Sequence, residues 1–144
     1  MTTTAPFSLP DFTLQPIGIV HSNLSSRKGA PRQAYEGAPD ASVEVHPAFA
    51  RALDGIRPGD DIVLLTWLHQ GRRDVLEVHP RGDVQNPLTG VFATRSPDRP
   101  NPIGLHRVQV TRIDGTRLDV RPLEAIDGTP VVDIKPVLER SDDA

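Results

Sequence analysis

Three polar side chains with hydrogen-bonding chemistry stand close together on an unusually stiff stretch of the chain. Arg95, Arg99 and Asn101 fall within residues 90–105, where prolines occupy three of the six positions 97–102. Proline fixes φ and holds the preceding residue extended, so the backbone polar groups here need partners elsewhere or a ligand. Strong polar groups held on such a rigid frame suit a binding site. Physical reasoning alone equally favours a stiff loop that only closes the fold, so both interpretations stay open.

The histidines are the other candidates for chemistry, and they favour acid–base roles over metal binding. They are His21, His46, His69, His79 and His106. None forms a His-x-x-x-His pair, and the chain has no cysteine, which excludes a thiolate zinc site, a disulfide scaffold and a cysteine nucleophile. A lone histidine usually serves as a hydrogen-bonded structural group or a general acid–base. We therefore expect no metal.

Other familiar motifs are absent or weak. The eleven glycines include no Gly-x-Gly pair, which excludes the dinucleotide-binding fingerprint and the phosphate-binding P-loop. The tripeptide at 81–83, Arg-Gly-Asp, is typical of a turn. The net charge of -3 excludes a generally polybasic nucleic-acid binder, although six arginines within residues 95–121 leave room for a local basic face.

Short strands must position these groups. Apolar and β-branched runs predict about six or seven strands. A proline at 47 and a glycine at 55 mark the start and the end of the single expected helix. Its residues Phe49, Ala52 and Leu53 should share one face and cover one end of a sheet. The run at 62–68 is continuously apolar, which predicts burial on both faces. Asp114-Gly115 predicts a hairpin, with a bulge near Ile113. The strands are expected at 15–21, 42–45, 62–68, 105–113, 117–121 and 131–134.

Together these elements predict a mostly β protein: a single small β-barrel with one short helix. We expect residues 1–14 to form a flexible N-terminal arm, 15–139 the barrel domain and 140–144 a short tail. No apolar run has the length of a membrane helix, and the N-terminus lacks the pattern of a secretory signal. The expected location is the cytosol.

Four segments carry a resemblance to a known family. They are residues 90–105, Pro31-Arg32-Gln33, Leu68-His69-Gln70 and residues 127–136. Together they closely resemble the TsaA-like (tRNA methyltransferase O) family over residues 15–139. The bacterial tRNA enzymes of that family carry a second, C-terminal domain, and we expect this chain to be a short form without it. The chain also has Val137 where the family often has an aromatic residue, and it is short between His69 and Val91.

The resemblance implies a β-barrel methyltransferase that forms homodimers and binds S-adenosylmethionine near the dimer interface. Its expected substrate is tRNA, methylated at N6 of threonylcarbamoyl-adenosine near the anticodon. By family resemblance, the cofactor-binding residues are Pro31, Arg32, Gln33, His69, Gln70, Arg95, Leu105, Glu124, Ala125, Ile126, Asp127, Gly128 and Thr129.

The residues that would act on the acceptor are assigned from their chemical type. A base for the N6 proton is expected at His69 or Asp133. Arg99, Asn101 and Lys135 are the expected substrate contacts, since basic groups meet the nucleic-acid backbone without reading its sequence. Two alternatives stay open: a methyltransferase with a non-tRNA substrate, and a non-enzymatic S-adenosylmethionine-binding regulator.

Overall fold

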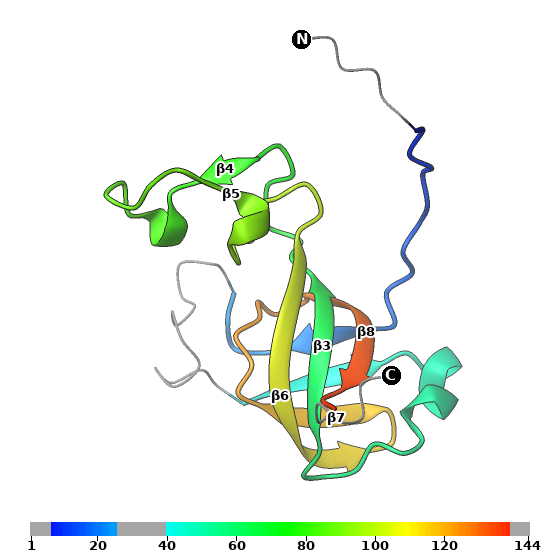
Figure 1. Ribbon diagram of the computed structural model, residues 1–144. Coiled ribbons are helices and arrows are strands. Elements are labelled where there is room, and N and C mark those ends of the chain that lie inside the picture. Colours follow the sequence, from blue (N-terminus) through cyan, green and yellow to red (C-terminus); the bar gives the residue numbers. More distant parts are fainter. Residues whose placement is uncertain (1–6, 26–39, 139–144) are drawn as a thin grey trace.

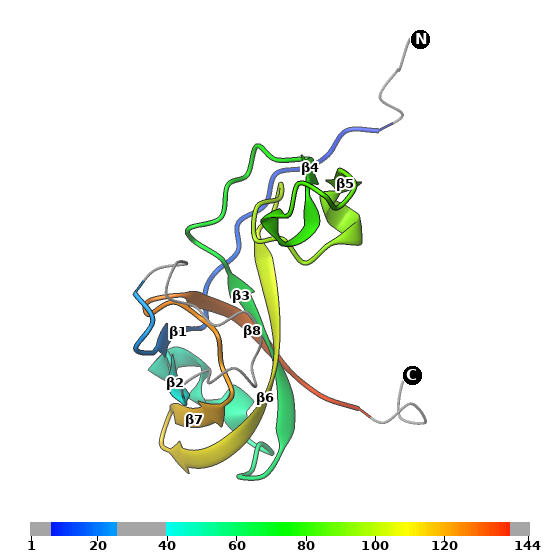
Figure 2. The ribbon, with the colours of Figure 1, turned by 90° about the vertical axis from the view of Figure 1, so that its left-hand side faces the viewer.

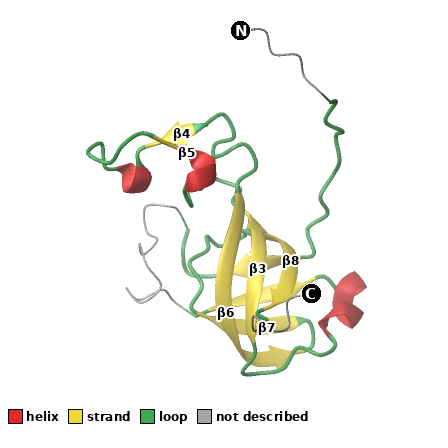
Figure 3. Ribbon diagram, in the orientation of Figure 1, coloured by secondary structure: helices red, strands yellow, loops and turns green. Residues whose placement is uncertain are grey.

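Six antiparallel strands close into a barrel in the computed structural model, which describes residues 7–25 and 40–138 (Figure 1). The order around the barrel is β1-β2-β7-β6-β3-β8, so neighbours in space are often distant in sequence. The strands are β1 (Gly18–His21), β2 (Ala41–Val45), β3 (Asp61–Trp67), β6 (Ile103–Asp114), β7 (Arg117–Arg121) and β8 (Pro130–Pro136). This confirms the predicted mostly β barrel, and Figure 3 shows how few helical residues there are. None of the helices in the described ranges combines the length and apolarity needed to cross a membrane.

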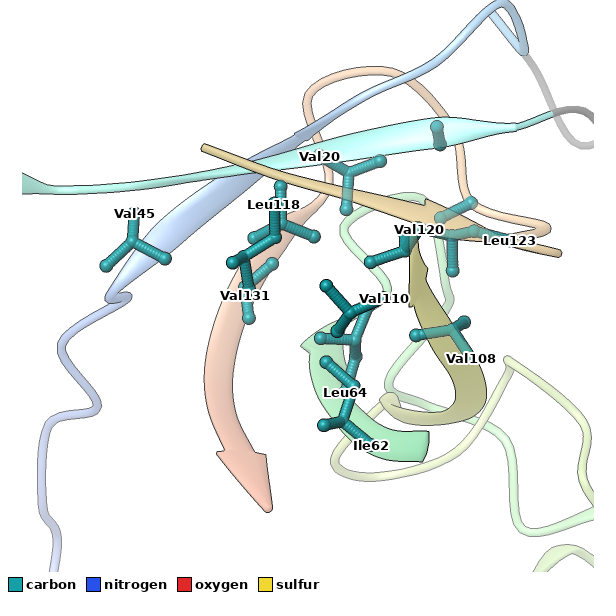
Figure 4. Close-up of a cluster of buried hydrophobic side chains, with 13 residues drawn as sticks. Val20, Val45, Ile62, Leu64, Val108, Val110, Leu118, Val120, Leu123 and Val131 are labelled. Atoms are coloured by element: carbon teal, nitrogen blue, oxygen red, sulfur yellow. The ribbon is translucent and has the colours of Figure 1, made fainter. Parts of the chain in front are cut away.

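The core is a set of branched aliphatic side chains that fill the barrel (Figure 4). On β3, Ile62, Leu64 and Thr66 are buried inside, whereas the alternate residues on the outer face are only partly buried. The expectation that this run is buried on both faces was therefore wrong. A closed barrel of this size has one inside, so even a continuously apolar strand alternates. Its outer face is left as a half-exposed apolar surface.

The predicted helix is a 3₁₀ helix, Pro47–Leu53, that begins where β2 ends. The Nδ1 atom of His46 accepts a hydrogen bond from the Ala48 amide at 3.1 Å and caps it. Phe49 and Leu53 pack against the core as expected, but Ala52 is exposed. The tighter winding of a 3₁₀ helix rotates Ala52 away from the face that an α-helix would have shared.

The hairpin between β6 and β7 follows the sequence prediction closely. Gly115 adopts a φ of 62° at the turn, which glycine reaches without steric cost. The pairing register shifts between Val110 and Arg112, which confirms the expected bulge and returns Ile113 to the core side. The bulge lets twelve residues of β6 curve around the barrel.

One element beyond the barrel was not predicted. A small extension, β4 (Glu77–Val78) paired with β5 (Thr89–Gly90), stands beyond the end of the barrel where β6 begins (Figures 1 and 2). It includes two single-turn 3₁₀ helices, η4 (Pro80–Gly82) and η5 (Val91–Ala93). Residues 7–16 run without regular structure along an extended path, with the side chains of Phe7 and Phe12 mostly exposed.

Candidate functional site

A cleft of about 300 Å³ opens at the end of the barrel where β3 finishes. Its walls come from the turn after β3, the proline-rich segment, β6 and the loop between β7 and β8. The lining residues are Leu68, His69, Gln70, Gly71, Arg95, Pro97, His106, Glu124, Ala125, Ile126 and Thr129. Barrel closure thus brings four distant parts of the sequence around one space.

The turn after β3 is fastened to the proline-rich segment by backbone hydrogen bonds. The Leu68 amide donates to the carbonyl of Pro102 at 2.7 Å, and the Arg99 amide donates to the carbonyl of Arg72 at 2.8 Å. The backbone groups that the prolines leave without local partners are in this way partly satisfied by a second segment. The stiff segment and the turn therefore form one continuous wall.

A glycine allows this wall to close. A Cβ atom at Gly71 would collide with the carbonyl oxygen of Pro97. The absence of a side chain lets the two backbones touch, and it places His69 and Gln70 on the cleft with exposed side chains. Both offer hydrogen-bonding groups to a ligand.

Arg72 adds an ion pair outside the cleft. Its amide donates to Oδ1 of Asp98 at 2.9 Å, and its guanidinium pairs with Asp74 at 3.1 Å. The side-chain hydrogen bond between Arg72 and Asp74 raises the pKa of the arginine and lowers that of the carboxyl group. Both side chains are exposed, so the pair contributes little to stability.

The floor of the cleft is a half-buried histidine held by a threonine. Nε2 of His106 lies 2.8 Å from Oγ1 of Thr66, which faces the barrel interior. Burial lowers the pKa of His106 to about 4, because the charged ring would lose its hydration. The floor is therefore neutral at physiological pH. Gly104 makes room for the pair, since a Cβ atom there would collide with Thr66 and His106.

The loop between β7 and β8 is held by the chain that follows β1. The Ser22 hydroxyl donates to the carbonyl of Ala125 at 2.6 Å, and the Ser22 amide donates to Oδ1 of Asp127 at 3.1 Å. Thr129 closes the loop with a hydroxyl bond to the carbonyl of Ile126 at 2.6 Å. These bonds fix the cleft wall that presents Glu124, Ala125 and Ile126.

Seven of the thirteen predicted cofactor residues line this cleft. They are His69, Gln70, Arg95, Glu124, Ala125, Ile126 and Thr129. Asp127 and Gly128 belong to the same loop but bond to the chain after β1 and to Val20. Leu105 lies on the outer face of β6, 51% exposed, and opposite Leu65. Pro31, Arg32 and Gln33 lie outside the described residues.

The structure does not bring the other predicted residues to the cleft lining. Asp133 is paired with Lys135 at 3.6 Å, and Lys135 lines a separate hollow beside the start of β3. Oδ1 of Asn101 accepts a hydrogen bond from Arg73 at 3.0 Å, beside the path of residues 9–16. Nη1 of Arg99 donates to the backbone carbonyls of Thr94 and Ser96 at 2.9 and 3.1 Å, so this side chain braces the segment that carries Arg95.

Sequence reasoning missed four cleft residues: Leu68, Gly71, Pro97 and His106. The signal for His106 was present in the strand periodicity. Val108 and Val110 lie on the inner face of their strand, and His106 has the same parity, so it points inward with them. Gly71 and Pro97 were not predictable in this way, because their contact joins two segments far apart in sequence.

The arrangement suits an organic ligand with both apolar and charged parts. Apolar side chains and a neutral imidazole cover part of the cleft, while Arg95 and Glu124 supply opposite charges. Within the described residues, no group of three or more His, Cys, Asp or Glu side chains could hold a metal ion.

The fold and the cleft define a small β-barrel protein with a candidate binding cleft at one barrel end. Residues 19–143 match the family described as the tRNA-methyltransferase O N-terminal domain. The chain belongs to this family, as the resemblance in the sequence indicated.

Relatives of similar length support the assignment. A probable S-adenosyl-L-methionine-binding protein of Methanocaldococcus jannaschii is 38% identical over 135 residues, covering 91% of this chain and 96% of the relative. An S-adenosyl-L-methionine-binding protein of Archaeoglobus fulgidus is 41% identical over 122 residues, covering 85% of this chain and 86% of the relative.

Solved structures show the same fold. The crystal structure of TrmO from Pseudomonas aeruginosa matches with a TM-score of 0.74 at 31% identity, covering 95% of this chain. Another TrmO crystal structure matches with a TM-score of 0.75 at 33% identity, covering 96% of this chain. The chain spans about 60% of the length of these solved proteins.

Proposed function

We propose that the protein binds S-adenosylmethionine in this cleft and transfers its methyl group to N6 of threonylcarbamoyl-adenosine in tRNA, near the anticodon. One observation carries the proposal: seven residues expected to contact the cofactor converge on a single cleft. The names of the relatives from M. jannaschii and A. fulgidus support the cofactor, and the family description supports the acceptor.

The chemistry of the cleft fits this cofactor, which joins a flat base, a ribose, a sulfonium and an amino-acid carboxylate. Leu68, Ala125 and Ile126 offer an apolar surface for the base. The guanidinium of Arg95 is suited to a carboxylate. His106 stays neutral and so adds no positive charge beneath a cationic sulfonium.

When bound, S-adenosylmethionine supplies an activated methyl group, and the protein must orient the acceptor and handle one proton. Rigid positioning provides much of such rate enhancement. His69 lines the cleft with an exposed side chain and is our candidate to accept the N6 proton. Asp133, the other candidate, is engaged with Lys135.

The test uses methyl-labelled S-adenosylmethionine and bulk tRNA from cells that lack this protein. Label should enter the RNA, and nucleoside analysis should find it on threonylcarbamoyl-adenosine. Nucleosides from the deletion cells should lack the same modification. Tight cofactor binding without label in the RNA would refute the tRNA assignment.

A second function is favoured by one observation: the two relatives of similar length are named only as binding proteins. A regulator would bind S-adenosylmethionine and transfer label to no cell fraction. Label in a small-molecule or protein fraction would instead identify a methyltransferase with a different acceptor.

A homodimer is part of the proposal. The outer face of β3 and β6 forms an apolar stripe in which Trp67 lies opposite Ile103 and Leu65 lies opposite Leu105. Ile103 and Leu105 are 44% and 51% exposed. Self-association through the stripe would cover this surface, and the expected cofactor contact of Leu105 would then reach the partner's site.

A further inference from the structure

A second, larger cleft adjoins the proposed cofactor cleft. It has a volume of about 850 Å³ and lies between residues 78–82 of the β4–β5 extension and residues 93–98. Arg95 and Pro97 line both clefts, so the two spaces share a wall. A volume of this size is within the range of sites for small organic groups.

The charged groups of this second cleft favour an anion. Arg81 and Arg95 line it, and neither side chain forms a hydrogen bond or ion pair with another residue in ranges 7–25 and 40–138. The one carboxylate of the lining, Asp98, accepts a hydrogen bond from the Arg72 amide at 2.9 Å. Two guanidinium groups thus keep their donors available, and guanidinium binds oxyanions through paired hydrogen bonds.

The backbone at Arg81 has an unusual conformation. Its φ of 60° is the only positive φ of a non-glycine residue in the described ranges. The turn around it is closed by the Gly82 amide, which donates to the carbonyl of His79 at 2.9 Å, and by the Asn86 side chain, which donates to the carbonyl of Pro80 at 2.8 Å. Glycine would adopt this conformation freely. A long charged side chain retained there points to a function for the charge.

The opposite wall is equally well braced. Arg99 donates to the carbonyls of Thr94 and Ser96, and the Thr94 hydroxyl donates to the carbonyl of Val91 at 3.0 Å. These bonds fix the backbone on either side of Arg95. Both walls are therefore ordered before a ligand arrives, which favours binding.

We propose that the second cleft binds an oxyanion of the methyl acceptor, a phosphate or a carboxylate. Arg81 is its main contact, and the five N–H donors of Arg95 are shared between this oxyanion and the cofactor in the first cleft. The inference rests on the proposed methyl transfer, since it gives the second cleft the acceptor. The shared wall brings an acceptor held there next to a methyl donor in the first cleft. The net charge of -3 need not oppose such binding, because the field at the cleft is set by its own two arginines.

The test is an anion titration of the full chain followed by NMR. Inorganic phosphate and acetate are added separately, and the amide signals of Gly82 and Ser96 are followed. Both amide signals should shift until they reach a plateau. Arg81→Gln should weaken the binding of the more tightly bound anion at least fivefold. Arg112→Gln is the matched control, an exposed arginine near the far end of β6 that pairs with Asp114 at 3.8 Å. The anion that binds more tightly shows whether the cleft recognises a phosphate or a carboxylate of the acceptor.

A second variant separates charge from structure. Arg81→Gly removes the guanidinium and accepts the positive φ, so it should melt no lower than the wild type and still lose the anion. Both variants should keep S-adenosylmethionine affinity and raise the KM for the acceptor with kcat retained. The titration requires no methyl transfer. Anion binding without methyl transfer would therefore contradict the proposed methyltransferase function and leave the anion site in the second cleft supported. Shifts that reach no plateau, or an unchanged anion affinity in Arg81→Gln, would overturn the proposal that the second cleft binds an oxyanion.

Discussion

Nε2 of His106 and Oγ1 of Thr66 meet at 2.8 Å on the floor of the cleft, at the point where the barrel interior ends. The pair joins adjacent strands β3 and β6: Thr66 is buried in the barrel, and His106 lines the candidate cleft. One half-buried imidazole therefore links the packing of the barrel to the candidate cleft.

The first prediction concerns pH. The folded state keeps His106 neutral down to a pKa of about 4, whereas the unfolded ring takes up a proton near pH 6.5. Between these values the unfolded state binds more protons, so the free energy of unfolding should fall as the pH drops from 6.5 to 4, by about 3 kcal/mol. Denaturant titrations of the wild type and His106→Gln at several pH values measure this free energy. An equal loss of unfolding free energy in both proteins between pH 6.5 and 4 would show that His106 is not the cause.

The second prediction concerns the glycine beside this pair. In Gly104→Ala the added methyl group would collide with Thr66 and His106, and overpacking of this kind costs about 1–3 kcal/mol. Chemical denaturation should show this loss, with weaker S-adenosylmethionine binding because the floor shifts. Gly90→Ala is the control, since a Cβ atom there has open space around it. If both variants are equally stable, the close packing around Gly104 is refuted.

The third prediction concerns Arg95. It lines the proposed cofactor cleft and forms no ion pair in the described part of the chain, so its charge is available to a ligand. Arg95→Ala should weaken S-adenosylmethionine binding by ~1.5–3 kcal/mol, the range for a lost charged hydrogen bond. Calorimetry measures this, with Arg112→Ala as the control. Unchanged affinity in a folded Arg95→Ala protein would remove Arg95 from the site.

Local signals made most of the barrel predictable. β7 was expected at 117–121 and is Arg117–Arg121, because an Asp-Gly turn and strand alternation act over a few residues. The two-residue strands β4 and β5 carry too little pattern to be recognised. The prediction that β3 is buried on both faces was wrong because an apolar run does not reveal whether a sheet closes on itself.

The site was predictable only in part, and for a related reason. The family motifs indicated His69, Gln70 and Arg95, which the structure brings to one cleft. Residue type alone indicated Asp133 and Arg99, but type does not show that a carboxylate pairs with Lys135 or that a guanidinium braces a loop. Such pairings depend on which strands become neighbours.

The fourth prediction concerns self-association. Leu65 and Leu105 face outward side by side on the apolar stripe, so a charge there would be buried without a partner in a dimer. Sedimentation at micromolar concentration should give about twice the 15.7 kDa chain mass for the wild type and the single-chain mass for Leu65→Asp. Val84→Asp is the control, an exposed apolar residue of the β4–β5 extension. A monomeric wild type with full cofactor affinity would contradict the dimer.

The last prediction separates two basic residues that were both expected to contact tRNA. Lys135 is paired with Asp133 beside a hollow near the start of β3, whereas Arg99 braces the segment that carries Arg95. Arg99→Ala should therefore weaken S-adenosylmethionine binding, because two carbonyls lose their donor and the cleft wall loosens. Lys135→Gln should be nearly silent, because an exposed ion pair contributes little.

A salt series with tRNA decides between this account and direct phosphate contacts. Each phosphate contact releases counterions, so a lost contact flattens the dependence of log affinity on log salt by about one unit. We expect the wild-type slope to be kept in Lys135→Gln. In Arg99→Ala the slope should also stay, while cofactor affinity falls. A slope reduced by about one unit in either variant, with cofactor affinity intact, would instead make that residue a phosphate contact.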